Sequence, residues 1–262
     1  MKHKFLKSLA LLFLTATSLI STGCEEIINE ILSEKDQWAY LVNEKSYDAV
    51  VDGSTLTYGS HTYSVSGTLS TDNLNGNYSS PTTWVTFSNI PSGYTEFSAV
   101  YNELLGRTVQ GTAAMVPMAL EIYARNKETG ERCLRLLCNS EATVTEMLRV
   151  LEERFKYNEY GGAYDSYVQR YIPAASLQGA TPNNAYRPDE PYTVAMCPSV
   201  NKSQNSSLGI VHNIYILSKG WTTNQRQIQI LQPNGGGRYK VFGCTSVYTQ
   251  CQTIVGTWRG LK

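Results

Sequence analysis

The chain has 262 residues, 42% of them hydrophobic and 17% charged, and its 22 basic residues equal its 22 acidic residues. This apolar content is sufficient for a packed core and excludes an intrinsically disordered chain. A neutral chain without a basic run also lacks the positive surface of a nucleic-acid binder, so no nucleic-acid partner is predicted.

The first 23 residues have the pattern of a lipoprotein signal peptide. Three lysines precede an apolar run at residues 8–20, which is too short to span a bilayer comfortably. The run is followed by Ser21-Thr22-Gly23-Cys24, which resembles a lipobox, although Ser21 stands where leucine is usual. The pattern predicts cleavage before Cys24 and acylation of Cys24, which anchors the chain in a membrane. An ordinary secretory peptide with an incidental Cys24 is the alternative.

The segment after Cys24 predicts a tether and indicates the cellular location of the protein. Glu25 and Glu26 are similar to the acidic surface-export signals of some lineages, so we expect an outer-membrane lipoprotein. The sequence leaves open whether it faces the periplasm or the cell surface. Residues 24–36 are predicted to form a tether with a short amphipathic helix.

Residues 37–93 form a β-rich region. Turn signals at Asp52-Gly53 and at Tyr58-Gly59-Ser60 separate short runs of Thr, Tyr and Val. This pattern predicts an antiparallel meander with one solvated face. The predicted strands are residues 47–51, 55–58, 62–68 and 83–87.

Residues 94–262 are predicted to form one α+β domain. Helical periodicity is found at residues 96–105 and at residues 112–126, where Pro117 lies near the first turns. It is found again after Gly130, from a capping box at Thr143–Glu146 to Phe155, and at residues 163–171. Four strands follow, at residues 192–197, 209–217, 227–231 and 239–243, the last two joined by the turn Pro233–Gly237. The fold class is therefore α+β: an N-terminal antiparallel β meander, central helices and a C-terminal antiparallel sheet of three to four strands.

The cysteines do not predict a metal site. Five remain besides Cys24, so at least one is unpaired within the chain; they are Cys133, Cys138, Cys197, Cys244 and Cys251. Cys133 and Cys138 are five apart on a predicted helix and do not face each other, whereas Cys244 and Cys251 can pair if a turn intervenes. Buried free thiols are the alternative. Without a C-x-x-C pair, and with only His61 and His212 after cleavage, neither a metal nor another cofactor is predicted.

A proline-containing segment at residues 179–192, called the proline strip below, is the most distinctive feature of the sequence. Its three prolines predict an extended chain. It is interpreted as a connector into the following strand. The alternative is a ligand-binding edge, in which tyrosine rings offer flat faces and charged groups fix a polar ligand. The candidate ligand-binding residues are Tyr186, Arg187, Asp189 and Tyr192.

The proline strip also carries a family resemblance. It reads Gly-Ala-Thr-Pro-x-Asn-x-Tyr-x-Pro-x-x-Pro-Tyr and follows an Ala- and Met-rich helix and Tyr171-Ile172-Pro173. With these features, residues 112–242 resemble a family of uncharacterised bacterial domains found in secreted proteins and lipoproteins. The resemblance covers about half the chain and excludes the meander. It implies a fold and an extracytoplasmic location, and it implies no activity.

The sequence holds no recognisable catalytic set. Gly-x-Ser-x-Gly, HExxH, EF-hand and Walker motifs are absent. No pattern in the sequence brings two of the acids Asp165, Asp189 and Glu190 together as the carboxyl pair that a glycosidase needs. Glu152-Glu153 is interpreted as part of a solvated helix face. Catalysis is therefore not predicted, and we expect a binding or envelope-assembly module for a glycan or an envelope protein. The alternatives are a hydrolase of glycan or cell-wall polymers, which needs two facing acids, and a structural lipoprotein, which needs an exposed apolar patch.

Overall fold

The computed structural model describes residues 46–71, 78–155, 170–205, 207–249, 251–257 and 260–261. The predicted signal peptide, Cys24 and the tether lie outside these residues. So does the predicted helix at 163–171, apart from its last two residues. The described chain belongs to a single unit, and none of its helices is both long enough and apolar enough to cross a bilayer.

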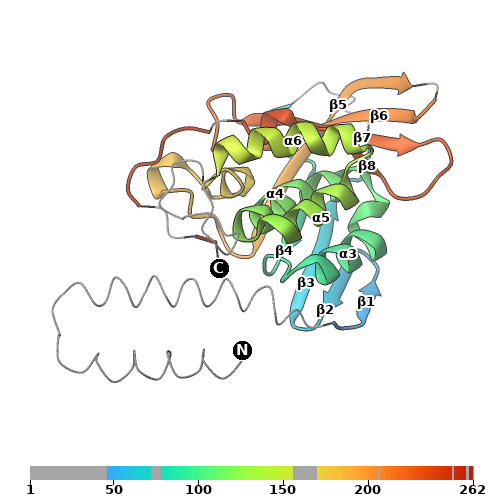
Figure 1. The fold of residues 1–262 in the computed structure, drawn as a ribbon, viewed down its shortest axis with the longest axis horizontal. Helices are drawn as coiled ribbons and strands as arrows, with labels where there is room; N and C mark the ends of the chain where they lie inside the picture. Colours follow the sequence, from blue (N-terminus) through green and yellow to red (C-terminus); the bar gives the residue numbers. More distant parts are fainter. Residues whose placement is uncertain are drawn as a thin grey trace, which may run out of the picture. The chain divides into compact units, whose positions relative to one another are not determined.

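One antiparallel sheet of eight strands organises the described chain, with the strands in sequence order (Figure 1). They are β1 (Ala49–Asp52), β2 (Thr55–Tyr58), β3 (His61–Gly67), β4 (Thr83–Phe87), β5 (Tyr192–Asn205), β6 (Gly209–Leu217), β7 (Gln225–Pro233) and β8 (Lys240–Gly243). Two-residue turns join β1 to β2 and β2 to β3, where the sequence predicts them. The predicted α+β class, with an N-terminal meander, central helices and C-terminal strands, is confirmed.

The meander and the C-terminal strands are continuous through β4 and β5. Thr86 lies opposite Thr193, and the pairing runs from Phe87–Tyr192 to Thr83–Met196. More than a hundred residues separate the two strands along the chain. The sequence predicts each group of strands from local patterns, but this long-range pairing joins them into one sheet across the boundary expected at residue 93.

Among the described residues, four α-helices and four short 3₁₀ helices accompany the sheet. They are α3 (Tyr94–Glu103), η1 (Leu105–Arg107), α4 (Val109–Arg125), α5 (Lys127–Leu137), α6 (Glu141–Arg154), η2 (Ala174–Ser176), η3 (Pro182–Asn184) and η4 (Thr245–Val247). Every residue of α4 except Arg125 is buried, so α4 is the core helix that the sequence predicts. It begins earlier than expected, capped by Thr108, so Pro117 lies in its interior and not near its first turns.

Two further helix boundaries differ from the predictions. Asn126 caps α5, so Gly130 lies inside this helix instead of preceding it. A Cβ atom at Gly130 would come within 2.0 Å of the Tyr123 Cα, which shows how closely α5 crosses α4. The side chain of Ser140 accepts from Thr143 N and caps α6, so the helix begins at Glu141 and the capping box predicted at Thr143 is wrong.

The α-helices cover one face of the sheet (Figure 1). In β4, Thr83, Val85 and Phe87 are buried on that side, whereas the intervening Trp84 and Thr86 are not. Trp84 and Thr86 therefore point to the opposite side, which is called the open face below.

Candidate functional site

A pocket of about 480 Å³ lies where three connecting segments meet. The β3–β4 connector, the β6–β7 connector and the segment that includes the start of the proline strip each contribute to its walls. The lining residues are Ser79, Pro81, Leu177, Gln178, Gly179, Ala180, Thr181, Asp189, Leu217, Ser218, Lys219 and Asn224. This volume is within the range of about 300–1,000 Å³ that is usual for small-molecule sites.

Hydrogen bonds at the start of β5 and at the end of β6 bring two of these segments together. Gln178 N donates to Thr193 O at 2.9 Å, and Asp189 N donates to Gln178 O at 3.0 Å. The side chain of Gln178 donates through Nε2 to Leu217 O at 2.6 Å. The proline strip is therefore fixed against β5 and β6, and Asp189 is held beside the pocket.

The middle of the proline strip is not extended as predicted. It folds into η3, where Thr181 and Asn184 form a reciprocal capping box. Ala185 and Tyr186 then adopt left-handed backbone conformations with φ of 53° and 54°. This turn reverses the chain direction and points the Tyr186 ring into the protein interior. An extended segment would instead have placed successive side chains on opposite sides.

Tyr186 belongs to a subsidiary core. Its ring is fully buried and stacks on Tyr171 with centroids 4.8 Å apart. Its hydroxyl lies 2.7 Å from Gln252 O and 3.0 Å from Gly220 O, and burial raises its pKa far above the ordinary value. Tyr192, at the start of β5, is only 3% exposed. The predicted presentation of these two tyrosine rings to a ligand is therefore wrong.

The other two candidate residues, Arg187 and Asp189, are both exposed, but they differ in their position relative to the pocket. Asp189 lines the pocket, whereas Arg187 does not. Lys219, Gln178 and Asn224 line the pocket too, and no motif marks them: Gln178 directly precedes the proline strip, and Lys219 and Asn224 come from the distant β6–β7 connector. Thus one of the four predicted ligand-binding residues is at the pocket.

The pocket lining suits hydrogen bonding to a polar ligand. Asp189 provides a carboxylate, Lys219 an ammonium group, and Gln178 and Asn224 provide amides. Among the lining residues, Asp189 is the single carboxylic acid, and neither histidine nor cysteine is present. Glycoside hydrolysis needs two facing carboxyl groups, and the lining residues of this pocket supply one of them.

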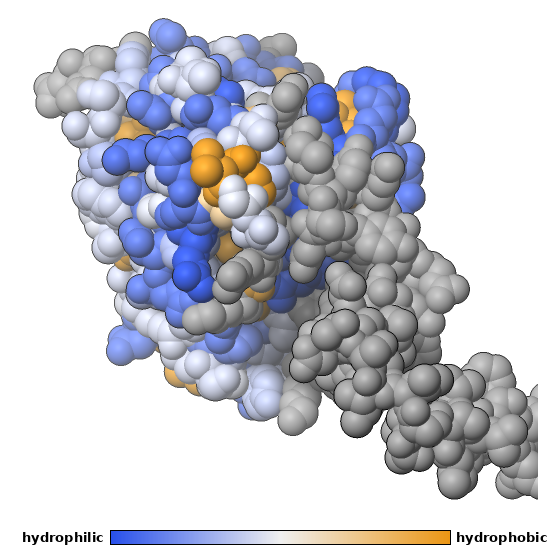
Figure 2. Space-filling view, turned by 90° about the vertical axis from the view of Figure 1, so that its left-hand side faces the viewer, coloured by the Kyte–Doolittle hydropathy of each residue, from blue (hydrophilic) through white to orange (hydrophobic). Residues whose placement is uncertain are grey.

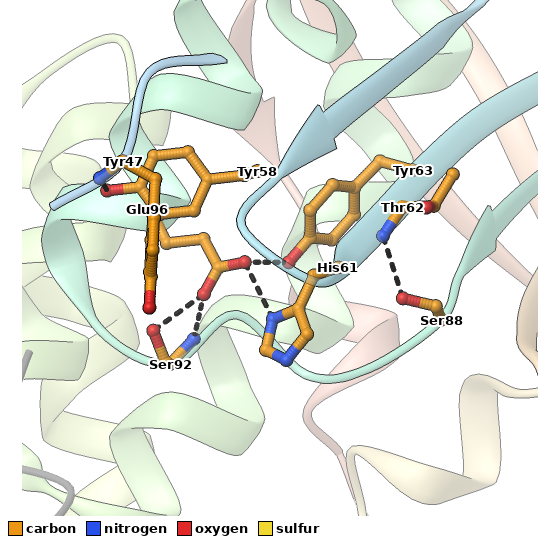
Figure 3. A network of polar contacts seen from close by, with 8 residues as sticks. All are labelled: Tyr47, Tyr58, His61, Thr62, Tyr63, Ser88, Ser92 and Glu96. Carbon is orange, nitrogen blue, oxygen red and sulfur yellow. Dashed lines mark hydrogen bonds and ion pairs between the residues drawn. The ribbon is translucent and has the colours of Figure 1, made fainter. Parts of the chain in front are cut away.

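A second polar cluster surrounds Glu96 in the first turn of α3 (Figure 3). Tyr63 donates through its hydroxyl to Glu96 Oε1 at 2.6 Å, and His61 Nδ1 lies 2.7 Å from the same oxygen. Ser92 donates to Oε2 through its backbone N at 2.7 Å and through Oγ at 2.6 Å. Glu96 is 1% exposed, so these four partners replace the water that its carboxylate loses on burial.

This cluster orients an imidazole without supplying a nucleophile. His61 is 22% exposed, and Glu96 fixes its ring through Nδ1. No described serine or cysteine contacts the other ring nitrogen. The arrangement therefore connects β3 to α3, and it explains why a charged residue is tolerated in the core.

The cysteines do not form disulfides among the described residues. Cys133, Cys138, Cys197, Cys244 and Cys251 are all free and buried, so the considered Cys244–Cys251 pair is not formed. Burial raises the pKa of Cys138 and of Cys251 to about 12, which disfavours the reactive thiolate. No described group of three or more His, Cys, Asp or Glu residues is arranged to hold a metal ion.

The surface is predominantly hydrophilic on the face drawn in Figure 2, where the hydrophobic areas of the described residues are small and separate from one another. The larger exposed apolar side chains are spread along the sequence: Tyr47, Val50, Val51, Leu69, Trp84, Leu208 and Val255. A structural lipoprotein would need a broad apolar patch, and this face does not provide one among the residues described.

Comparison with known proteins identifies the family. A family model described as a domain of unknown function, DUF6935, matches residues 89–255, which include α3 to β8 and most of the pocket. The resemblance at residues 112–242 lies within this range, and it is confirmed at the level of a domain of unknown function. No curated protein and no solved structure matches the chain significantly. Because the match covers more than half of the sequence, the chain belongs to the DUF6935 family.

Proposed function

We propose that this protein is a lipid-anchored, non-catalytic binding module of the cell envelope that holds a sugar residue of a glycan in its pocket. The composition of the pocket carries this proposal. Sugar hydroxyls both donate and accept hydrogen bonds. Asp189 can accept, Lys219 can donate, and the amides of Gln178 and Asn224 can do both.

The anchor is proposed at Cys24, on the strength of the lysines, the apolar run and the cysteine at lipobox spacing. Two or three acyl chains hold a protein stably in a bilayer. The partners are then the outer membrane, through the lipid, and a glycan, through the pocket. Labelling of cells with a clickable palmitate analogue tests the anchor: the label is expected on the wild-type chain and absent from Cys24→Ala.

Binding is better supported than hydrolysis of a glycan or cell-wall polymer. Hydrolysis needs a general acid and a second carboxylate on opposite sides of the scissile bond. Asp189 is the single acid among the pocket-lining residues, and the carboxylate of Glu96 is buried and already has four partners. An envelope protein as partner remains an outcome of the experiment below.

The experiment is thermal unfolding of the chain without its signal peptide, in the presence of a panel of saccharides, followed by calorimetric titration of those that stabilise it. A ligand at 100 times its dissociation constant adds about 2.7 kcal/mol. We expect Asp189→Asn and Lys219→Ala to weaken binding. The control is Arg187→Ala, because this neighbouring exposed side chain does not line the pocket. Equal affinity of Asp189→Asn and wild type would refute the pocket as the binding site. Absence of binding to every saccharide of the panel would refute the proposal and favour an envelope protein as partner.

A further inference from the structure

The open face carries no charge across its central strands. On this side of β2 to β7 the partly or fully exposed side chains are hydroxyl, amide or aromatic groups and one proline, whereas the apolar side chains on the same side are buried: Ala195, Cys197, Val211, Leu217 and Leu231. Ser64, Thr86 and Thr193 form one cross-strand row of hydroxyl groups. A surface of this kind offers hydrogen bonds without an electrostatic field, so it is complementary to a neutral polyol and not to a nucleic acid or an anionic lipid.

The amides of this face are held in fixed positions. Asn213 accepts through Oδ1 from Gln227 Nε2 at 2.6 Å and from Gln229 Nε2 at 3.3 Å. The amide nitrogen of Asn213 donates to Asn201 O at 2.8 Å. Because the three side chains order one another, a ligand that binds them loses less conformational entropy than it would with free side chains.

Aromatic rings lie among these polar groups. Trp84 is 36% exposed, and its ring lies close to Gly67, where an added Cβ would come within 3.0 Å of it. Tyr215 is partly buried and contacts Tyr78 edge to face, with centroids 5.2 Å apart. The C–H face of a pyranose packs on such rings, while its hydroxyl groups reach polar neighbours.

Two links place this face next to the pocket. Leu217 is two residues after Tyr215 on the same side of β6, and it lines the pocket. Tyr78 is followed directly by Ser79, another lining residue. Tyr215 and the pocket are therefore neighbours, whereas Trp84 lies two strands away on β4, across the buried Ala195 with which it pairs.

We propose that the open face extends the pocket into a binding site for a neutral glycan chain. One sugar residue occupies the pocket, and the following residues lie along Trp84 and Tyr215. This inference rests on the proposed function, because it takes the pocket as the terminal subsite. It adds that the ligand is an oligomer without charge and that affinity depends on its length.

The test uses the chain without its signal peptide and a length series of neutral probes. These probes are malto-, cello-, xylo- and manno-oligosaccharides of one to six units, titrated calorimetrically. For the series that binds, we expect affinity to rise about tenfold between the monosaccharide and the tetrasaccharide, because aromatic contacts are added. Trp84→Ala and Tyr215→Ala should remove that gain and leave monosaccharide affinity unchanged, whereas Asp189→Asn should weaken all lengths.

The control variant is Tyr47→Ala, because Tyr47 is an aromatic residue of similar exposure that precedes β1, at the edge of the sheet. Its length dependence should match that of the wild type. Melting curves confirm that each variant is folded. A length-independent affinity that still falls in Asp189→Asn would overturn the extended site and keep the pocket. A length-dependent affinity that is lost in Trp84→Ala but not in Asp189→Asn would overturn the pocket. Failure of all four series to bind would overturn both.

Discussion

His61 Nδ1 lies 2.7 Å from Glu96 Oε1, and this contact joins the β2–β3 turn to the first turn of α3. His61 lies before the range matched by the family model, and Glu96 lies within it. Tyr63, also from β3, donates to the same oxygen. The meander is therefore attached to the family domain through this buried carboxylate as well as through the β4–β5 pairing.

We expect Glu96→Ala to destabilise the protein by about 3 kcal/mol, because it leaves buried donors of Tyr63 and Ser92 without an acceptor. Urea unfolding followed by circular dichroism measures the change. The control is Glu103→Ala on the same helix, where an exposed pair with Arg107 is lost and an effect within about 0.5 kcal/mol is expected. Equal stability of the two variants would show that the Glu96 cluster contributes nothing.

Tyr186 allows a graded test of the subsidiary core. Tyr186→Phe keeps the stacking on Tyr171 and loses the hydroxyl contacts, so a cost of about 1 kcal/mol is expected. Tyr186→Ala also leaves a cavity and should cost about 4 kcal/mol. Arg187→Ala, at the adjacent exposed position, should unfold like the wild type. If Tyr186→Ala were as stable as Arg187→Ala, the inward position of the ring would be wrong.

Glu121 makes stability depend on acid. Burial alone would raise the pKa of its carboxyl, but Arg170, which binds both oxygens at 2.7 and 2.8 Å, and Arg125 together lower the pKa below the ordinary value. Because the pKa of Glu121 is lower in the folded than in the unfolded state, its carboxylate stabilises the fold fully at pH values above the unfolded-state pKa. This contribution is lost as the pH falls through the pKa of the folded state. The free energy of unfolding should therefore fall as the solution is acidified below the ordinary carboxyl range.

Glu121→Gln provides the comparison for this pH dependence. The variant should be less stable at pH 7 by about 3 kcal/mol, because Arg170 and Arg125 lose the buried carboxylate that both contact. Its stability should also fall less steeply in acid than that of the wild type. Chemical unfolding at a series of pH values measures both effects. Parallel pH profiles would show that the carboxylate does not supply this dependence.

Gly179 positions Asp189 at the pocket. Its φ is +78°, and a Cβ there would come within 2.4 Å of the Asp189 Cγ. Gly179→Ala should therefore cost about 2 kcal/mol through backbone strain and should displace the carboxylate, weakening ligand binding. Gly235→Ala is the matched control, since nothing lies within 4 Å of its added Cβ. Unfolding and calorimetric titration of both variants test this, and unchanged binding in Gly179→Ala would contradict the assignment of Asp189.

Local patterns predict the hairpins because a hairpin is determined by adjacent residues. Gly53 and Gly59 stand where two-residue turns need them, and the strands on either side follow with the expected alternation. The same reasoning fails in the proline strip. The capping box between Thr181 and Asn184 overrides the extended preference of the prolines and sends Tyr186 into the core.

The candidate sites depend on contacts that are distant in sequence. The pocket combines Ser79, Asp189 and Lys219 from three connectors, and the long-range β4–β5 pairing helps to bring the first of them to the others. His61 and Glu96 are likewise 35 positions apart and share no motif. No pattern within a single segment predicts such a juxtaposition. Of these residues, Asp189 alone could be selected from the sequence, because it lies in the distinctive proline strip.

The joining of β4 to β5 has a consequence for the family as a whole. The matched range begins at residue 89, yet β5 inside it hydrogen-bonds to β4 outside it. A fragment of residues 89–255 would leave that edge of β5 uncovered from Tyr192 to Met196, and an uncovered strand edge recruits strands from other molecules. Such a fragment should self-associate or exchange strands between copies. A relative that lacks the meander must shield the same edge in another way, so the range matched by the family model is smaller than the unit that covers this strand edge.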